Sequence, residues 1–292
     1  MEHISAARTG SPRSYLYVPG DRADHLEKAL NRGADAIILD LEDAVIAANK
    51  AAARDIVTGW LLDQADHFLP SVWLRITAES PAGDIQAISA PIAGVMVPRA
   101  EATLLAEVNE LLAAKEYALG CQPGSISVIP LIESARGLLS ALELAGAPRT
   151  LRLAIGRADL AGELGLGVDP EGPEFGGILL QLVIASSAAG IAAPLAPTST
   201  DFRDLDALRA STEQLLRLGF RGRTAVHPAQ LAVINDVFTP SPDEVERATA
   251  LVSAFEAAQR DGSGVTTDEQ GRMVDAAVVR SARDVLARAG AA

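Results

Sequence analysis

The sequence predicts an α/β fold, a (β/α)8 TIM barrel followed by a C-terminal helical extension. Short apolar segments, typical of parallel strands buried on both faces, alternate with amphipathic stretches of helical period. Eight such units in about 250 residues fit a closed barrel better than an open doubly wound sheet. We therefore expect residues 1–239 to form the barrel and residues 240–292 to form the extension.

The expected elements follow one another in strict alternation. The predicted strands are 14–19, 36–41, 72–76, 94–98, 126–132, 151–155, 191–195 and 224–226. The clearest predicted helices are 24–31, 50–62, 103–118, 136–144 and 205–218, and the apolar segment 177–190 is predicted to be a buried helix. Four helices are followed by glycines suited to a left-handed cap, namely Gly33, Gly120, Gly190 and Gly219.

Composition and charge narrow the functional classes. The 292 residues carry a net charge of −13, which disfavours nucleic acid and anionic membranes as partners. No apolar run reaches the roughly 18 residues of a membrane span, and the first residues do not resemble a secretory signal, so we expect a cytoplasmic protein. The single cysteine, Cys121, has no partner for a disulfide and is expected to be incidental.

The extension is predicted to contain two helices joined by a turn. Ser241 and Glu244 form a capping-box pattern at the start of a helix that runs to about Arg260. The turn 261–264 leads to the tail 271–292, whose second half is predicted to be helical. The apolar side chains of this tail need a surface, which we expect to be a neighbouring subunit, with its own barrel as the alternative.

Polar side chains at the carboxyl ends of the predicted strands are the candidates for chemistry, because barrel enzymes build their sites there. Glu133 ends the fifth predicted strand and Asp159 the sixth. Neighbouring strands would direct both carboxylates to one point, where Mg2+, or Mn2+, would balance their charge. The alternative is structural, with Glu133 capping the next helix and Asp159 pairing with Arg157 or Arg136.

Arginines and further acids lie on the same rim. Arg75 ends the third strand, where a fixed guanidinium can hold a carboxylate or a developing enolate oxygen with two hydrogen bonds. The acidic run DLED contributes Glu42 and Asp43, and Arg75 or Arg99 could instead serve only to neutralise them. His227, at the end of the eighth strand, is expected to be a structural hydrogen-bonding residue rather than a base.

A series of short motifs resembles the citrate lyase β-subunit-like branch of the HpcH/HpaI aldolase family. The resemblance runs from Arg13 to about Leu286, and its motifs occur in the family's order. They are RSYLYVPGDR (13–22), DLEDAV (40–45), LRI (74–76), VPR (97–99), IPLIES (129–134), GRADL (156–160), VHP (226–228), FTPSP (238–242) and MVD (273–275). Each motif alone is weak, but together they make an accidental match implausible.

The resemblance implies roles for the rim residues. Glu133 and Asp159 would bind Mg2+, and Glu133 would also border the substrate site. Arg75 would bind the carboxylate or acyl oxygen of the substrate. Glu42 and Asp43 would orient water molecules bound to the metal.

The resemblance also implies contacts outside the barrel rim. Arg22 and Lys28 would contact the phosphates of CoA. In such relatives the C-terminal tail reaches over a neighbouring subunit, so Asp275 would serve another chain's site. We therefore expect a homo-oligomer, a trimer or a hexamer.

The expected activity is Mg2+-dependent cleavage or formation of a small 3-hydroxyacyl-CoA thioester, such as citryl-, malyl- or citramalyl-CoA, by a retro-Claisen mechanism. Two enzymatic alternatives stay open. They are an aldolase that releases pyruvate from a free 4-hydroxy-2-oxo acid, and an acyl-CoA thioesterase acting at the same site. A third alternative is a non-catalytic subunit of a larger lyase complex.

Overall fold

The computed structural model describes residues 11–64, 71–167 and 174–290. The chain divides into two compact units, a barrel unit, Pro12–Asn235, and a C-terminal unit that contains the chain from Asp236 onward. The division lies inside helix α10 (Leu231–Phe238), close to the expected boundary between residues 239 and 240. We describe each unit by itself.

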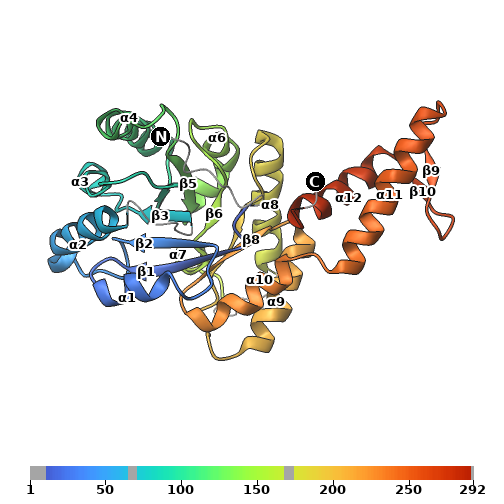
Figure 1. The fold of residues 1–292 in the computed structure, drawn as a ribbon. Coiled ribbons are helices and arrows are strands. Elements are labelled where there is room, and N and C mark those ends of the chain that lie inside the picture. The colour runs from blue at the N-terminus through green and yellow to red at the C-terminus, as the bar shows by residue number, and fades with distance from the viewer. Residues whose placement is uncertain (1–10, 65–70, 168–173, 291–292) are drawn as a thin grey trace. The chain divides into compact units, whose positions relative to one another are not determined.

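The barrel unit is a closed barrel of parallel strands, which confirms the predicted fold class. The strands pair in chain order, and β1 also pairs with β8 to close the barrel (Figure 1). Within the described residues they are β1 (Ser14–Pro19), β2 (Ala36–Asp40), β3 (Ser71–Arg75), β4 (Gly94–Val97), β5 (Ser127–Ile132), β6 (Ala154–Ile155), β7 (Leu195–Ala196) and β8 (Gly222–Ala225).

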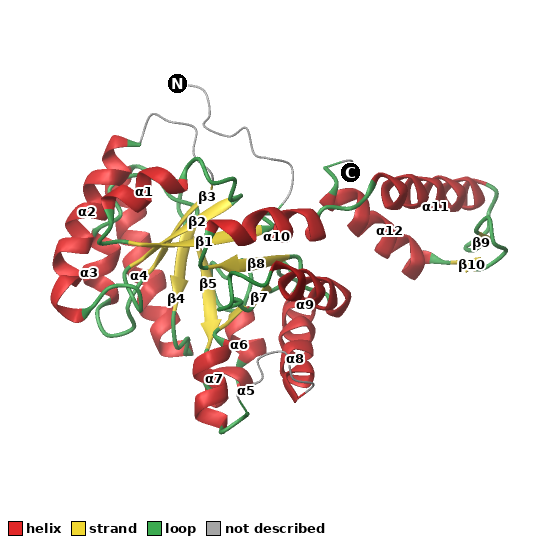
Figure 2. Ribbon diagram, turned by 90° about the horizontal axis from the view of Figure 1, so that it is seen from below, coloured by secondary structure: helices red, strands yellow, loops and turns green. Residues whose placement is uncertain are grey.

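Helices lie outside these strands (Figure 2). They are α1 (Ala23–Ala29), α2 (Lys50–Asp63), α3 (Pro81–Gln86), α4 (Ala102–Leu119), α5 (Ala135–Leu139), α6 (Ala141–Ala145), α7 (Arg157–Leu164), α8 (Glu174–Ala189), α9 (Leu205–Leu218) and α10, with short 3-10 turns η1 (Ala47–Asn49) and η2 (Pro228–Gln230). The four glycines predicted as caps all have positive φ, and Gly120 and Gly219 end α4 and α9 in the left-handed conformation. The prediction for Gly33 is wrong, because α1 ends at Ala29 with Leu30 as its C-cap.

An apolar core fills the barrel. Its buried members are Tyr15, Ala36, Ile38, Trp73, Met96, Ile129, Leu131, Ala154 and Leu195. Side chains two positions apart on a strand point to the same face, so the inward position after Ile38 is Asp40 and the one after Trp73 is Arg75. The interior therefore changes from apolar to charged at the carboxyl ends of the strands.

Five strands lie within one residue of their predicted bounds, and three differ by more. β6 contains only Ala154–Ile155 rather than 151–155, and β7 is Leu195–Ala196 rather than 191–195. Pro194 has no N–H to donate, so residues 191–194 cannot form a continuous ladder. β8 begins at Gly222, two residues before the prediction, because the glycine and the following arginine gave no apolar pattern.

Two predicted helices differ in more than their end residues. The segment predicted as one helix, 136–144, is divided into α5 and α6 at Ser140, whose backbone leaves the helical range. Helix α8 forms where a buried helix was predicted, but Ile184 is 60% exposed, so one face of it meets solvent. No helix among the described residues has both the length and the apolar character needed to cross a membrane.

The C-terminal unit is a helical hairpin that has its own small core. It consists of α11 (Pro242–Arg260), the short strands β9 (Thr266–Thr267) and β10 (Met273–Val274), and α12 (Ala276–Arg288). The predicted capping box of Ser241 and Glu244 is present at the start of α11. Phe255, Val274 and Val279 are buried together, so α11 covers part of the apolar surface for which a neighbouring subunit was expected.

Candidate active site

The charged end of the barrel is centred on Arg75, at the end of β3. Its guanidinium donates from Nε to Asp40 Oδ1 over 2.7 Å and from Nη2 to Asp40 Oδ2 over 2.6 Å, a two-pronged ion pair. The register of β2 and β3 places these residues side by side, and both are buried. Asp40 was absent from the predicted site residues, although its inward position on β2 is visible in the alternation with Ala36 and Ile38.

Two more carboxylates approach the same guanidinium. Arg75 Nη1 lies 2.9 Å from Glu42 Oε2 and 3.0 Å from Asp43 Oδ2, and the guanidinium carbon lies 4.9 Å from the centre of the Tyr17 ring. The alternative in which Arg75 neutralises Glu42 and Asp43 therefore describes its contacts, whereas Arg99 takes no part in this cluster. One cation faces three anions here, so the cluster has excess negative charge.

Burial and the neighbouring charges change the acidity of the loop residues. Burial raises the pKa of Glu42 to about 7, its contact with Asp43 adds to the rise, and Arg75 opposes it. Burial also disfavours the charged form of Asp43, but contacts with Glu42 and Arg75 outweigh it and lower the Asp43 pKa. Lys50 Nζ donates to the backbone carbonyls of Leu41 and Glu42 over 2.8 and 2.9 Å, which holds the loop in place.

Glu133 and Asp159 form a second acidic pair at the carboxyl ends of β5 and β6. Glu133 is 8% exposed, and its Oε2 accepts the backbone N–H of Arg99 over 2.9 Å. Burial raises the pKa of Glu133 to about 7, the Arg99 N–H opposes the rise, and the charge of Asp159 adds to it. Asp159 does not end the sixth strand as predicted, because α7 already begins at Arg157 and places it in the first turn of that helix.

The alternative in which Glu133 caps the next helix is wrong. Ser134, not Glu133, caps α5, because its hydroxyl accepts the backbone N–H of Gly137 over 3.0 Å. Among the described residues no cluster of three or more His, Cys, Asp and Glu side chains is arranged to hold a metal ion. Glu133 and Asp159 would thus supply two hard oxygen ligands, a set that suits Mg2+ with its other positions open.

The residues expected to contact CoA lie at α1, after β1, where Arg22 is the N-cap and Lys28 is in the last turn. Arg22 Nε lies 3.3 Å from Asp24 Oδ1, and Lys28 Nζ lies 3.2 Å from Asp24 Oδ2. All three side chains are about half exposed. Both cations share the Asp24 carboxylate, and Asp21 and Glu27 lie on the same segment, so positive charge here is confined to these two side chains.

Asp275 lies in the C-terminal unit, where it begins α12. Its carboxylate accepts the backbone N–H groups of Ala277 and Val278 over 2.9 and 3.0 Å, so it is the N-cap of that helix. This role was not part of the sequence prediction. A capping carboxylate is visible in a sequence as an Asp just before an amphipathic helix.

His227 has structural contacts at the end of β8. Its Nδ1 accepts the backbone N–H of Ala229 over 3.1 Å, and its ring stacks on Phe202 with the ring centres 4.5 Å apart. These contacts agree with the structural role that we expected.

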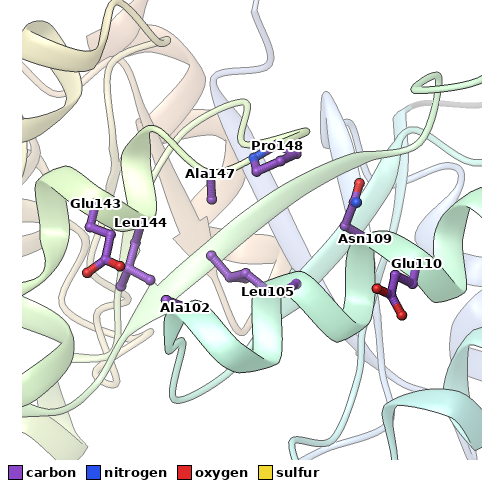
Figure 3. Close-up of a pocket in the computed structure, with 9 residues that line it drawn as sticks. Ala102, Leu105, Asn109, Glu110, Glu143, Leu144, Ala147 and Pro148 are labelled. Atoms are coloured by element: carbon purple, nitrogen blue, oxygen red, sulfur yellow. The ribbon is translucent and has the colours of Figure 1, made fainter.

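A hollow lies between α4 and α6 and is lined by side chains such as Leu105 and Leu144 (Figure 3). None of the rim carboxylates lines it.

Comparisons with known proteins show which family the chain resembles over most of its length. The family model of HpcH/HpaI aldolase/citrate lyase matches residues 13–228. A (3S)-malyl-CoA thioesterase of Cereibacter sphaeroides is 36% identical over 279 residues, covering 96% of this chain and 95% of that protein. The citrate lyase subunit beta of Escherichia coli K12 is 30% identical over 292 residues, covering 98% and 96%.

Solved structures are similar as well. CitE from Mycobacterium tuberculosis, in complex with magnesium, acetoacetate and coenzyme A, has a TM-score of 0.74 at 29% identity, covering 97% of this chain and 99% of that chain. The citrate lyase beta subunit of that organism, complexed with oxaloacetate and magnesium, has a TM-score of 0.65 at 29% identity, covering 80% and 99%. The predicted resemblance is therefore confirmed, and the chain belongs to the HpcH/HpaI aldolase/citrate lyase family of enzymes.

Proposed function

We propose that the protein is a Mg2+-dependent lyase that cleaves or forms a small 3-hydroxyacyl-CoA thioester, such as citryl-, malyl- or citramalyl-CoA. The observation that carries this proposal is the acidic pair of Glu133 and Asp159 beside the Arg75 cluster, in a chain of this family. Relatives support the substrate class and the metal, since one is a malyl-CoA thioesterase and another holds magnesium with coenzyme A.

Glu133 and Asp159 would hold the metal ion, and Glu42 and Asp43 would orient its water molecules. When bound, Mg2+, or Mn2+, supplies a Lewis acid for the substrate's carboxylate and hydroxyl oxygens. The two-carboxylate set fits this ion, because Mg2+ often takes one or two protein carboxylates and fills its other positions with water and substrate. The pKa of Glu133 is raised mainly by burial and further by the charge of Asp159, and a bound cation would offset both effects.

Arg75 would stabilise negative charge on the substrate. Asp40 fixes the Nε and Nη2 side of the guanidinium, whereas the Nη1 side meets Asp43, whose side chain is 68% exposed. Asp43 is the partner that can yield to a substrate oxygen. Arg75 would then contact the thioester oxygen as it gains charge.

The cleavage itself needs a base near neutral pKa. Glu42, with a pKa of about 7, suits removal of the hydroxyl proton. The O–H electron pair forms the new carbonyl, and the carbon–carbon bond breaks. Its electrons leave on the acyl-CoA as an enolate, which then takes up a proton to give the acyl-CoA product.

The remaining contacts complete the proposed site. Arg22 and Lys28 would bind the phosphates of CoA through their half-exposed side chains, which would exchange the Asp24 carboxylate for phosphate. The protein would act as a homo-oligomer, a trimer or a hexamer, in which Asp275 of one chain serves a neighbour's barrel. The exposed side chains of Met273 and Val278 on the tail are consistent with a partner surface.

A panel of hydroxyacyl-CoA esters tests the activity. Each ester is incubated with the purified chain and Mg2+, and free CoA and the shortened acyl-CoA are followed separately. A lyase releases acyl-CoA before CoA, whereas a thioesterase, favoured by the name of the 36% identical relative, releases only CoA. Activity on free 4-hydroxy-2-oxo acids alone would indicate the pyruvate aldolase, and no activity on any substrate would indicate a non-catalytic subunit.

Two isosteric variants test the residues. Glu133→Gln and Asp159→Asn should each lower kcat/KM at least about 1000-fold, because an amide is a poor ligand for Mg2+. Glu110→Gln on the surface of α4 is the matched control and should leave the rate unchanged. Wild-type activity in either site variant would contradict the metal assignment.

A further inference from the structure

Arg99 has an unusual backbone. Its φ is 47°, in the left-handed region that residues other than glycine rarely adopt. It follows β4, and the next residue, Ala100, donates its N–H to Leu131 O of β5 over 3.2 Å. This turn directs the Arg99 N–H across to Glu133 Oε2, 2.9 Å away.

The Arg99 side chain takes little part in this contact. It is 67% exposed, and its Nη1 lies 4.0 Å from Glu79 Oε1, at the limit of an ion pair. The contact with Glu133 therefore comes from the backbone conformation. Strained backbone of this kind is concentrated at functional sites, where the surrounding structure holds it in place.

Gly156 meets the same carboxylate from the opposite neighbouring strand. It follows β6 and donates its N–H to Ile132 O over 2.9 Å. A β-carbon at this position would overlap Glu133 Cγ and Oε1 and would fall 2.9 Å from Glu133 Cδ. The Glu133 side chain thus lies directly against the backbone of Gly156.

We infer that the Arg99 backbone and Gly156 form a clamp, supplied by the loops after β4 and β6, that fixes the orientation of the Glu133 carboxylate for a divalent cation. Both are positioning residues. The inference rests on the proposed function, in which Glu133 is a metal ligand. Each carboxylate oxygen has two lone pairs, so the Arg99 N–H leaves acceptor capacity for the cation. Outer contacts of this kind commonly change metal affinity 10- to 100-fold.

Two neutral substitutions of Arg99 separate the backbone from the side chain. Asn adopts the left-handed conformation readily, whereas the β-branched Val does not. Binding of Mn2+ to metal-free protein, followed by electron paramagnetic resonance, should be within about threefold of wild type for Arg99→Asn and about 10- to 100-fold weaker for Arg99→Val. Equal losses in both variants would assign the effect to the guanidinium and overturn the clamp, and so would wild-type affinity in Arg99→Val.

Thermal unfolding of the metal-free variants guards against a general loss of structure. Arg99→Gly, which accepts the same φ without strain, should bind Mn2+ as Arg99→Asn does even if Arg99→Val folds poorly. Weak binding by a folded Arg99→Gly protein would overturn the role of the backbone.

A matched pair of glycine variants tests the other side of the clamp. Gly156 has φ −92°, which alanine also adopts, so Gly156→Ala acts only by overlap with Glu133. Gly162 in α7 has no neighbouring atom within 4 Å of an added β-carbon, so Gly162→Ala is the control. We expect Mn2+ affinity about 10- to 100-fold weaker for Gly156→Ala and unchanged for Gly162→Ala. Wild-type affinity in Gly156→Ala would overturn this half of the clamp.

Glu133→Gln, measured in the same Mn2+-binding assay, separates the assignment of Glu133 as a metal ligand from the clamp that positions it. If it binds Mn2+ as tightly as wild type, the metal assignment fails, and the clamp fails with it. If it loses Mn2+ while Arg99→Val and Gly156→Ala retain it, the clamp alone fails.

Discussion

The two ends of the barrel use the same residue types in opposite ways. At the amino ends of β5 and β6, the buried Glu116 accepts the backbone N–H groups of Gly124 and Ile126, both over 2.8 Å, and forms an ion pair with Arg149. Burial opposes its charged form, but the contact with Arg149 and the two backbone N–H groups together outweigh burial and lower the pKa of Glu116. One anion meets one cation, and every contact of this pair serves the structure.

At the carboxyl ends the balance is different. Arg75 meets Asp40, Glu42 and Asp43, and the pKa values of Glu42 and Glu133 are both raised to about 7. A buried arginine and a buried carboxylate are thus not a functional pattern by themselves. Unbalanced negative charge is what distinguishes the end of the barrel that would take up a cation and a substrate.

The largest expected effect is on stability at the balanced end. Glu116→Gln should lower the free energy of unfolding by about 3–5 kcal/mol, because it leaves the buried Arg149 without its anion. Urea unfolding measures this loss. Residual enzyme activity per folded molecule should be unchanged, and the double variant Glu116→Gln/Arg149→Met should lose less than Glu116→Gln alone. A loss of unfolding free energy below about 1 kcal/mol would show that this ion pair contributes no more than a typical surface pair.

The same pair predicts how stability depends on pH. The pKa of Glu116 is lower in the folded than in the unfolded protein, so its contribution is fully present above the unfolded value. It is lost as the pH falls through the folded value. Stability of the wild type should therefore fall more steeply in acid than that of Glu116→Gln, and parallel curves would contradict this.

At the unbalanced end, Arg75→Lys should lower kcat about 100-fold, nearly as much as Arg75→Ala. An ammonium keeps the charge but cannot reproduce the two-pronged contact with Asp40 while facing the substrate. Steady-state kinetics measures the loss, and the melting temperature shows whether the fold persists. If lysine restores most of the rate, Arg75 supplies only general positive potential.

The raised pKa of Glu133 predicts pH-dependent metal binding. A cation must displace the proton that Glu133 carries below a pH of about 7, so Mg2+ affinity should fall about tenfold per pH unit below this value and stay constant above it. Calorimetric titration of the metal-free protein between about pH 5.5 and 8.5 tests this. Affinity that does not vary across this range would show that Glu133 is already ionised without the metal.

The smallest expected effect is the activity recovered in mixed oligomers that carry an Asp275 variant. Asp275→Asn keeps an N-cap for α12 but removes the charge, so it should preserve stability and lose activity if the carboxylate serves a neighbouring barrel. Random mixing of Asp275→Asn and Glu133→Gln chains should restore about a quarter of the wild-type activity, because a quarter of the shared sites receive both native groups. Hybrids that stay inactive after verified subunit exchange would assign Asp275 to capping alone.

The barrel was predictable because apolar strand segments and amphipathic helical segments alternate regularly along the sequence. Eight apolar segments and the capping glycines Gly120 and Gly219 are visible without contacts, and polar residues at strand ends indicated Glu133 and Arg75. Asp40 was missed because a charged residue at the end of an apolar run does not reveal its pairing partner. The left-handed backbone of Arg99 was hidden too, because arginine carries no sequence preference for that conformation.

The closure of the barrel has a consequence for how the chain folds. Strand β1 pairs with β8, and Ser14 lies opposite Arg223, about 200 residues later in the chain. During synthesis, the outer edge of β1 has no partner until almost the whole barrel has left the ribosome. This long-range pairing makes barrel closure a slow step, and until it occurs the open edge of β1 is a point where two nascent chains can associate.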